Sequence, residues 1–226
     1  MSVKIYSLKK DGNKKLSKHF KVKEFRCKDG SDKILIEGEL LTYLEKIYGH
    51  FGCLKININS AYRTAAHDKK VGGKGKGNHV QGKAVDFVAY DKNGDKIPSR
   101  EIALYLEDLG VKGIGYRCGK NAYATHMDIN YRTKKWYGDE AKSMSASIGS
   151  SFYDYLRVRY VTRTVKVSSN LKVREEPTLT AKTVTTLKNG EKIKVADTQK
   201  IKRDGYTWVR VKVNGKHAWV AEKYLK

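Results

Sequence analysis

HVQGKAVDFVAY, residues 79–90, is the stretch that decides the fold of the first part of this chain. Its second half, VDFVAY, reads as a strand with apolar side chains on both faces, which predicts that it lies inside a domain. Asp86 stands within that strand, and a buried carboxylate is costly unless it is paired or bound to a metal ion. The sequence thus predicts a cation beside Asp86, and His79 is a candidate to help to hold it.

A second histidine lies further along, in YATHMDIN, residues 123–130. This segment reads as a strand, so His126 and Asp128 share one face, because alternate side chains of a strand point the same way. Two imidazoles and one carboxylate are the ligands that a catalytic zinc ion takes when its fourth position is kept for water. We therefore expect His79, Asp86 and His126 to bind Zn²⁺.

A general base would complete such a site. A water on zinc has a pKa of about 7, and its proton must pass to the leaving amine during peptide hydrolysis. Asp128 lies two residues after His126 and projects toward the same space, so we predict that it is this base. The alternative is that Asp128 holds an imidazole in the correct tautomer.

Residues that could hold a substrate follow KININSAYR, residues 55–63, whose alternation predicts a half-buried strand. Arg63 stands at the end of this strand and can pair through two hydrogen bonds with a carboxylate, such as the carboxyl end of a peptide. A solvated surface arginine is the alternative. Tyr62 and Tyr116 are expected to line the cleft and bind substrate, with simple packing as the alternative.

Helices and strands occur together in residues 1–137, which predicts an α+β domain with a small antiparallel sheet. Apolar residues recur at helical spacing from about residue 32 to 48, and a second helix is expected between residues 99 and 110. The glycine-rich loop at residues 71–79 is expected to be flexible.

The composition changes after residue 137. GDEAKSMSASIGSS is small and polar, so residues 138–163 are expected to form a linker region. Short strands separated by turn residues follow over residues 164–226. Repeated short strands without helices predict a second, all-β domain, either a small barrel or a sandwich.

Charge limits the partners of this chain. Its 226 residues carry a formal net charge of +23, which attracts polyanions such as nucleic acid, anionic membranes and the anionic polymers of a bacterial wall. No basic stripe interleaved with aromatic residues marks a nucleic-acid module, and no apolar run is long enough to predict a membrane span. The first residues lack the apolar region of a secretory signal, so synthesis in the cytoplasm is expected.

SAYRT, H-x6-D and H-x-D together resemble the M15 zinc peptidases, a group of D-Ala-D-Ala carboxypeptidases and peptidoglycan endopeptidases. The resemblance covers residues 16–132 and implies the three zinc ligands named above. It also implies that Arg63 binds a substrate carboxylate and that Asp128 is the acidic residue of H-x-D. Other branches of the family carry a catalytic acid three residues before the last histidine, where this chain has Tyr123.

NLKVREEP, LKNGEKIKV and YTWVRVKVNGKHAWV resemble a bacterial SH3 (SH3b) domain that binds cell walls. This implies an SH3-like barrel over residues 164–226, with Trp208 and Trp219 in its core. An M15-like domain joined to such a module resembles a bacteriophage endolysin, which is made in the host cytoplasm and reaches the wall through holin pores.

One function and one alternative from another class follow. The chain is expected to be a monomeric, zinc-dependent peptidoglycan peptidase, either a D-Ala-D-Ala carboxypeptidase or an L-Ala-D-Glu-type endopeptidase. Its expected partners are peptidoglycan and the anionic polymers of the wall. The alternative is a non-catalytic, metal-stabilised protein that binds the wall.

Overall fold

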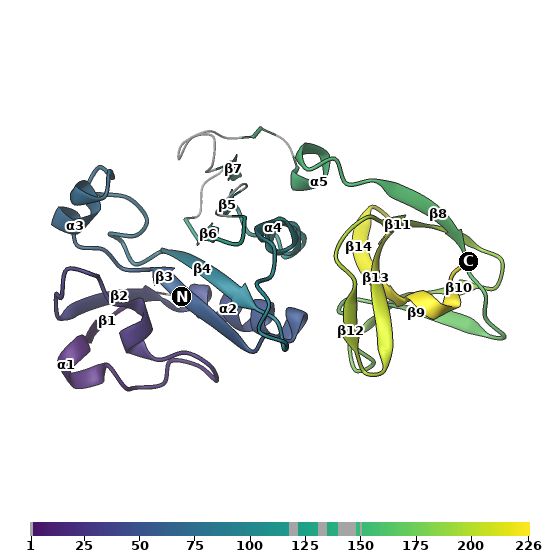
Figure 1. Ribbon diagram of the computed structural model, residues 1–226, viewed down its shortest axis with the longest axis horizontal. Helices are drawn as coiled ribbons and strands as arrows, with labels where there is room; N and C mark the ends of the chain where they lie inside the picture. The colour runs from purple at the N-terminus through teal and green to yellow at the C-terminus, as the bar shows by residue number, and fades with distance from the viewer. Residues whose placement is uncertain (1, 118–121, 131–134, 140–147, 150) are drawn as a thin grey trace. The chain divides into compact units, whose positions relative to one another are not determined.

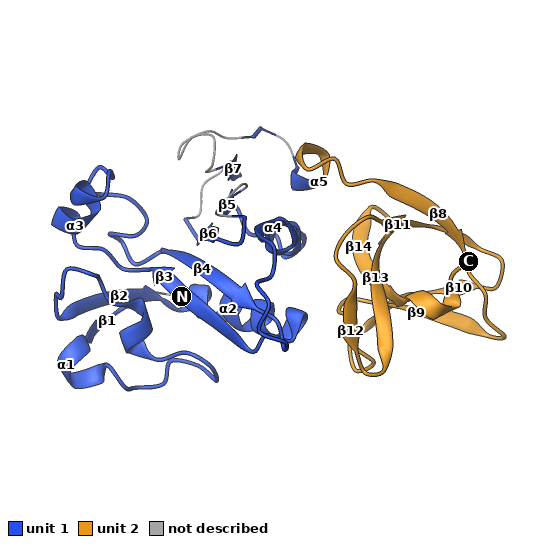
Figure 2. Cartoon of the chain, in the orientation of Figure 1, with its two compact units in different colours: residues 1–152 blue, residues 153–226 orange. Residues whose placement is uncertain are grey.

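The computed structural model describes residues 2–117, 122–130, 135–139, 148–149 and 151–226 (Figure 1). It divides into two compact units, Met1–Phe152 and Tyr153–Lys226, called here the N-terminal and C-terminal units (Figure 2). The boundary falls inside the stretch expected to be a linker. Both ends of that stretch lie in strands, β7 (Trp136–Asp139) and β8 (Tyr160–Thr164), with the short helix α5 (Phe152–Tyr155) at the boundary.

A five-stranded sheet forms the centre of the N-terminal unit, in the order β3-β4-β6-β5-β7. Its first four strands in the sequence are β3 (Lys55–Ser60), β4 (Ala84–Tyr90), β5 (Gly113–Tyr116) and β6 (Thr125–Asp128). Neighbours are antiparallel except β5 and β7, which are parallel. The prediction of an antiparallel sheet is therefore wrong at this edge. After β6 the chain turns back, and β7 runs in the same direction as β5 along its free edge.

The two faces of this sheet differ in chemistry. Asp86 pairs with His126 across β4 and β6, and Ala84 pairs with Asp128, so these four side chains share one face. The residues between them point to the other face and form a fully buried core, which includes Val85, Phe87, Ile114 and Met127. Helix α2 (Gly38–Phe51) contacts β4, and helix α4 (Ser99–Asp108) contacts β5 and β6. The apolar face is therefore buried, and the other face carries the ionisable groups.

The N-terminal segment forms a second, two-stranded sheet. It contains β1 (Val3–Ser7), α1 (Leu8–Asp11), the 3-10 helix η1 (Val22–Phe25) and β2 (Lys33–Glu37). The prediction of a single helix from about residue 32 to 48 is therefore wrong for its first residues. Its first residues form β2, which pairs antiparallel with β1, and α2 begins only at Gly38. The run KILIE contains two isoleucines, and β-branched side chains favour a strand when a partner strand is available.

Gly82 ties the loop before β4 to β2. Its φ of +69° is in the left-handed region, and a Cβ at this position would lie 2.5 Å from the carbonyl oxygen of Leu35. Its own carbonyl accepts a hydrogen bond from the Glu37 N–H at 2.9 Å, and its N–H donates to the His79 carbonyl at 3.1 Å. Only glycine fits this conformation and this close approach of two backbones.

Replacing Gly82 with alanine should lower the free energy of unfolding by roughly 2–4 kcal/mol, because a side chain there combines backbone strain with a backbone clash. Urea unfolding monitored by circular dichroism measures the change. Gly77→Ala is the matched control, since a Cβ at that loop position meets no atom within 4 Å. Equal stability of both variants would contradict the constraint proposed for Gly82.

The C-terminal unit is a seven-stranded antiparallel sheet in the order β10-β9-β14-β13-β11-β8, with β12 paired to β13. Besides β8, its elements are β9 (Asn170–Arg174), β10 (Thr183–Lys188), β11 (Lys192–Ala196), β12 (Ile201–Arg203), β13 (Tyr206–Val213), β14 (Lys216–Ala221) and the 3-10 helix η3 (Glu222–Tyr224). Valines, leucine and isoleucine fill its core, and Trp208 and Trp219 are buried as expected. This unit is all-β, and its strands form an open sheet, with β10 and β8 at the two ends of the strand order.

No helix in the described part of the chain is long and apolar enough to cross a membrane.

Candidate metal centre

The side chains of His79, Asp86 and His126 meet on the polar face of the N-terminal sheet. One nitrogen or oxygen from each lies within 4.8 Å of the other two, a grouping that could hold a metal ion. β4 supplies Asp86, β6 supplies His126 directly opposite, and the loop before β4 supplies His79. Two imidazoles and one carboxylate match the donor set of a catalytic zinc ion.

The orientation of His79 is fixed by a backbone contact. Its Nδ1 lies 2.7 Å from the carbonyl oxygen of Ala61, which can only accept a hydrogen bond, so Nδ1 carries the proton. Nε2 is then the ring nitrogen that remains to bind a metal ion, and it lies 3.4 Å from Asp86 Oδ2. The ring is 8% exposed. His79 is thus held with its metal-binding nitrogen toward the centre.

His126 lies between two carboxylates. Its Nδ1 is 2.8 Å from Asp86 Oδ1, and its Nε2 is 3.5 Å from Asp128 Oδ2. Asp128 also accepts a hydrogen bond from the Asn130 N–H at 3.0 Å. The Asp128 residue is only 2% exposed, and a Cβ at Gly113 on the neighbouring strand would overlap its carboxylate. The glycine makes room for Asp128 behind the imidazole.

Asp86 is held in its charged form. Burial alone would raise the pKa of this carboxyl, but hydrogen bonds and charge from His126 and His79 outweigh burial and hold the pKa well below its usual value. A carboxylate must be deprotonated to bind a metal ion, so the environment of Asp86 suits it to that role.

Arg63 also reaches this centre. Its Nε donates to the Ser60 hydroxyl at 2.8 Å, one terminal nitrogen donates to Asp68 at 3.3 Å, and the other donates to Asp86 Oδ2 at 3.0 Å. These bonds use three of the five N–H groups of a guanidinium. The side chain is held in place and is not the solvated surface arginine of the alternative reading.

Asp68 is a residue of the centre that the sequence reading missed. It lies in α3 (Ala65–Lys70), is buried, and binds both Arg63 and the Gly75 N–H, the latter at 2.9 Å. It therefore attaches the glycine-rich loop to α3 at Gly75. The sequence contains a signal for this helix, because threonine is a favourable N-cap residue. In the structure the Thr64 side chain accepts a hydrogen bond from the His67 N–H. A helix starting there places Asp68 one turn after Arg63.

The two tyrosines expected to bind substrate have different surroundings. Tyr62 is 7% exposed, and burial, with the nearby Cys27 and Asp29, raises the pKa of its hydroxyl. Tyr116 follows Gly115, the cross-strand partner of His126, so its side chain points to the opposite face of the sheet. There its ring packs edge-on against Phe152, with centroids 6.3 Å apart. The contact of these two tyrosines with substrate stays a prediction.

Trp136 is a second residue of the centre that the sequence reading did not single out. On β7 it pairs with Gly113, and its ring packs edge-on against His126 with centroids 6.0 Å apart. The expected linker began just after it, so no strand was predicted here. The indole covers part of the imidazole and limits its access to water.

Comparisons with known proteins relate each part of the chain to a described family. The family model for Peptidase M15 matches residues 18–128, and the model for the bacterial SH3 domain matches residues 169–226. Among solved structures, the antimicrobial peptidase lysostaphin from Staphylococcus simulans matches with 12% sequence identity and a TM-score of 0.24, over 62% of this chain and 63% of that chain. The chain thus spans less than two thirds of that structure. The search of curated proteins found no match.

Proposed function

The chain carries a Peptidase M15 domain at residues 18–128 and a bacterial SH3 domain at residues 169–226, and from this we propose that it is a zinc-dependent peptidoglycan peptidase. The observation that carries the proposal is the meeting of His79, Asp86 and His126 on one face of the sheet. The Ala61 carbonyl orients the ring of His79, and Asp86 is held in the charged form that metal binding requires. The donor set of the site therefore fits zinc.

Zinc, when bound by these three residues, would polarise the carbonyl of the scissile amide and lower the pKa of a water molecule. The other groups of the centre are proposed to place the substrate. Arg63 has two N–H groups beyond its three bonds, and these can receive a carboxylate of a peptidoglycan stem peptide. Ser60 and Asp68 hold the guanidinium so that it loses little conformational freedom on binding.

Asp128 is proposed to orient His126. When Nδ1 of His126 binds the metal ion beside Asp86, the ring proton would lie on Nε2, which is 3.5 Å from Asp128 Oδ2, as in other metal sites where a carboxylate fixes a ligating imidazole. The role of general base, which we first expected for Asp128, requires access to a water molecule. The side chain of Asp128 is only 3% exposed, so its position favours the orienting role.

The C-terminal unit is proposed to hold the protein on the wall as an SH3-like barrel. A peptidase domain joined to a wall-binding domain suits a bacteriophage endolysin, and we propose this biological role. The formal net charge of +23 would strengthen attachment to an anionic envelope.

Metal analysis combined with mass spectrometry of digested wall tests the proposed activity. We expect one zinc per chain, new peptide amino groups in the digest, and loss of both after chelation with recovery on added zinc. Released single alanine would identify a carboxypeptidase, and a larger peptide would identify an endopeptidase. Bound zinc with an unaltered wall would contradict catalysis and favour a metal-stabilised binding protein, while digestion that resists chelation would contradict the role of the metal.

A further inference from the structure

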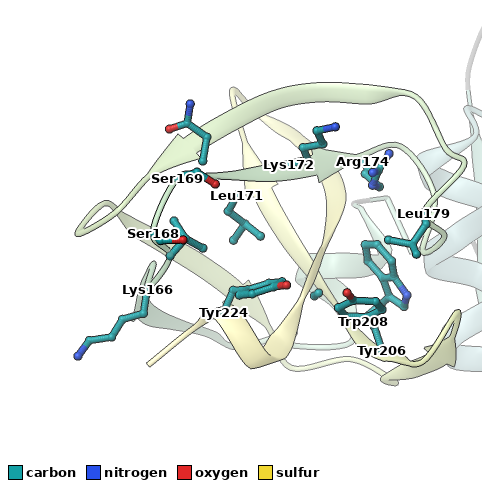
Figure 3. Close-up of a pocket in the computed structure, with 13 residues that line it drawn as sticks. Lys166, Ser168, Ser169, Leu171, Lys172, Arg174, Leu179, Tyr206, Trp208 and Tyr224 are labelled. Atoms are coloured by element: carbon teal, nitrogen blue, oxygen red, sulfur yellow. The ribbon is translucent and has the colours of Figure 1, made fainter.

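A pocket of about 410 Å³ opens in the C-terminal unit, lined by residues from β9, β13, β14, η3 and the loops before and after β9 (Figure 3). Three basic residues line it, Lys166, Lys172 and Arg174, and the lining, all of it in the described part of the chain, contains no carboxylate. Lys172 and Arg174 are two residues apart on β9 and so project to the same side of the strand. We call this the β9 pocket.

Aromatic side chains form another part of the β9 pocket. Tyr206, Trp208 and Tyr224 line it together, as Figure 3 shows. Trp208 is anchored by a hydrogen bond from its ring nitrogen to the Arg203 carbonyl at 3.0 Å. The Lys223 ammonium lies 4.3 Å from the ring centroid of Tyr206 and 4.9 Å from that of Tyr224, which adds a fourth cation beside the rings.

The cations of the pocket are only partly neutralised by the protein. Lys166 is exposed and has Lys226 as a neighbour, which lowers the pKa of Lys166 through a hydrogen bond and through its positive charge. Arg174 donates one N–H to the Ala181 carbonyl at 2.6 Å, a neutral acceptor. Positive groups placed close together without a carboxylate among them favour an anionic ligand.

We propose that the β9 pocket binds a phosphate-bearing polyol polymer of the cell envelope. The inference rests on the proposed function, because it takes the bacterial wall as the place of action. Lysine ammonium groups bind phosphates as point charges, so lysines spread around a pocket suit negative charges spaced along a chain. Tyrosine ring faces and hydroxyl groups can contact the polyol units between the phosphates. The pocket thus selects a repeating charged chain rather than a single carboxylate.

Titration calorimetry of the full-length protein with a synthetic glycerol phosphate oligomer, at fixed salt, tests the proposal. The double variant Lys166→Gln/Lys172→Gln should bind the oligomer about tenfold or more weakly, because two charged contacts are lost. The matched control is Lys192→Gln/Lys194→Gln, which removes the same charge from exposed positions of β11 in the same unit. Its affinity should stay within about twofold of the unmodified protein.

Several outcomes would overturn the pocket as the site. Equal losses in both double variants would mean that overall charge alone attracts the polymer. Equal affinity for an uncharged oligoglycerol, or for polyglutamate or DNA of the same charge, would remove the selectivity for polyol phosphate. Wall digestion by the unmodified protein is measured separately. Oligomer binding without digestion would leave this inference standing while the proposed peptidase activity failed, and digestion without oligomer binding would have the opposite meaning.

Discussion

Replacing Asp86 with asparagine should weaken zinc binding by at least about a hundredfold and reduce wall hydrolysis to background. The amide keeps the shape of the carboxylate but loses its charge. Asp86 also contacts both histidines of the centre. Its Oδ1 lies 2.8 Å from His126 Nδ1, and its Oδ2 lies 3.4 Å from His79 Nε2. Loss of the charge therefore affects the ion directly and the placement of both imidazoles. Competition with a zinc-binding dye measures the affinity, and mass spectrometry of digested wall measures hydrolysis.

Asp95→Asn is the control for this change, since Asp95 is an exposed carboxylate in the turn after the same strand. It should bind zinc and digest wall like the unmodified protein. Circular dichroism of both variants separates a lost metal site from a lost fold. Normal zinc affinity in Asp86→Asn would show that the ion, if the protein binds one, lies elsewhere.

Replacing Asp128 with asparagine should lower the affinity for zinc by about 10–100-fold, because the carboxylate no longer fixes His126 by charge. At saturating zinc most of the hydrolytic activity should return. A general base would give the opposite pattern, with unchanged zinc affinity and a turnover rate about 10²–10⁴-fold lower. Zinc affinity and turnover at saturating zinc, measured on the same preparation, decide between the two roles.

Asp139→Asn is the matched control for a buried amide in the same sheet. Asp139 is buried on β7 and pairs with Tyr116, so it lies on the face opposite the metal centre. A similar loss of zinc affinity in this variant would mean that both substitutions act by disturbing the sheet. Nitrogen-15 NMR of the His126 ring in the zinc-loaded protein adds a direct readout, with the proton expected on Nε2 in the unmodified chain.

The polar face of the site could be predicted from the sequence because the residues that define it lie close together within single strands. A strand with period two places His126 and Asp128 on one face, and the cost of burying Asp86 requires a partner nearby. The structure brings these residues together as that reasoning expects. The buried tryptophans of the C-terminal unit were predictable because Trp208 and Trp219 stand beside valines in short strands, and such large apolar side chains fill the core of a small β domain.

The features that the sequence did not predict depend on contacts between separate segments of the chain. The residues of β2 carry apolar side chains that suit either a helix or a strand, and only the partner strand β1 decides between them. The parallel pairing of β7 with β5 depends on the path of the chain after β6. The contact of Asp68 with Arg63 became visible only once the turn between them was known.

Alternation along β4 and β6 places core residues on one face and Asp86, His126 and Asp128 of the proposed metal centre on the other. Exchanges on one side of these strands can therefore accumulate during evolution with little effect on the packing beneath. A lineage that keeps the core residues is free to alter the opposite face. This arrangement allows related proteins to diversify on that face while they retain one scaffold.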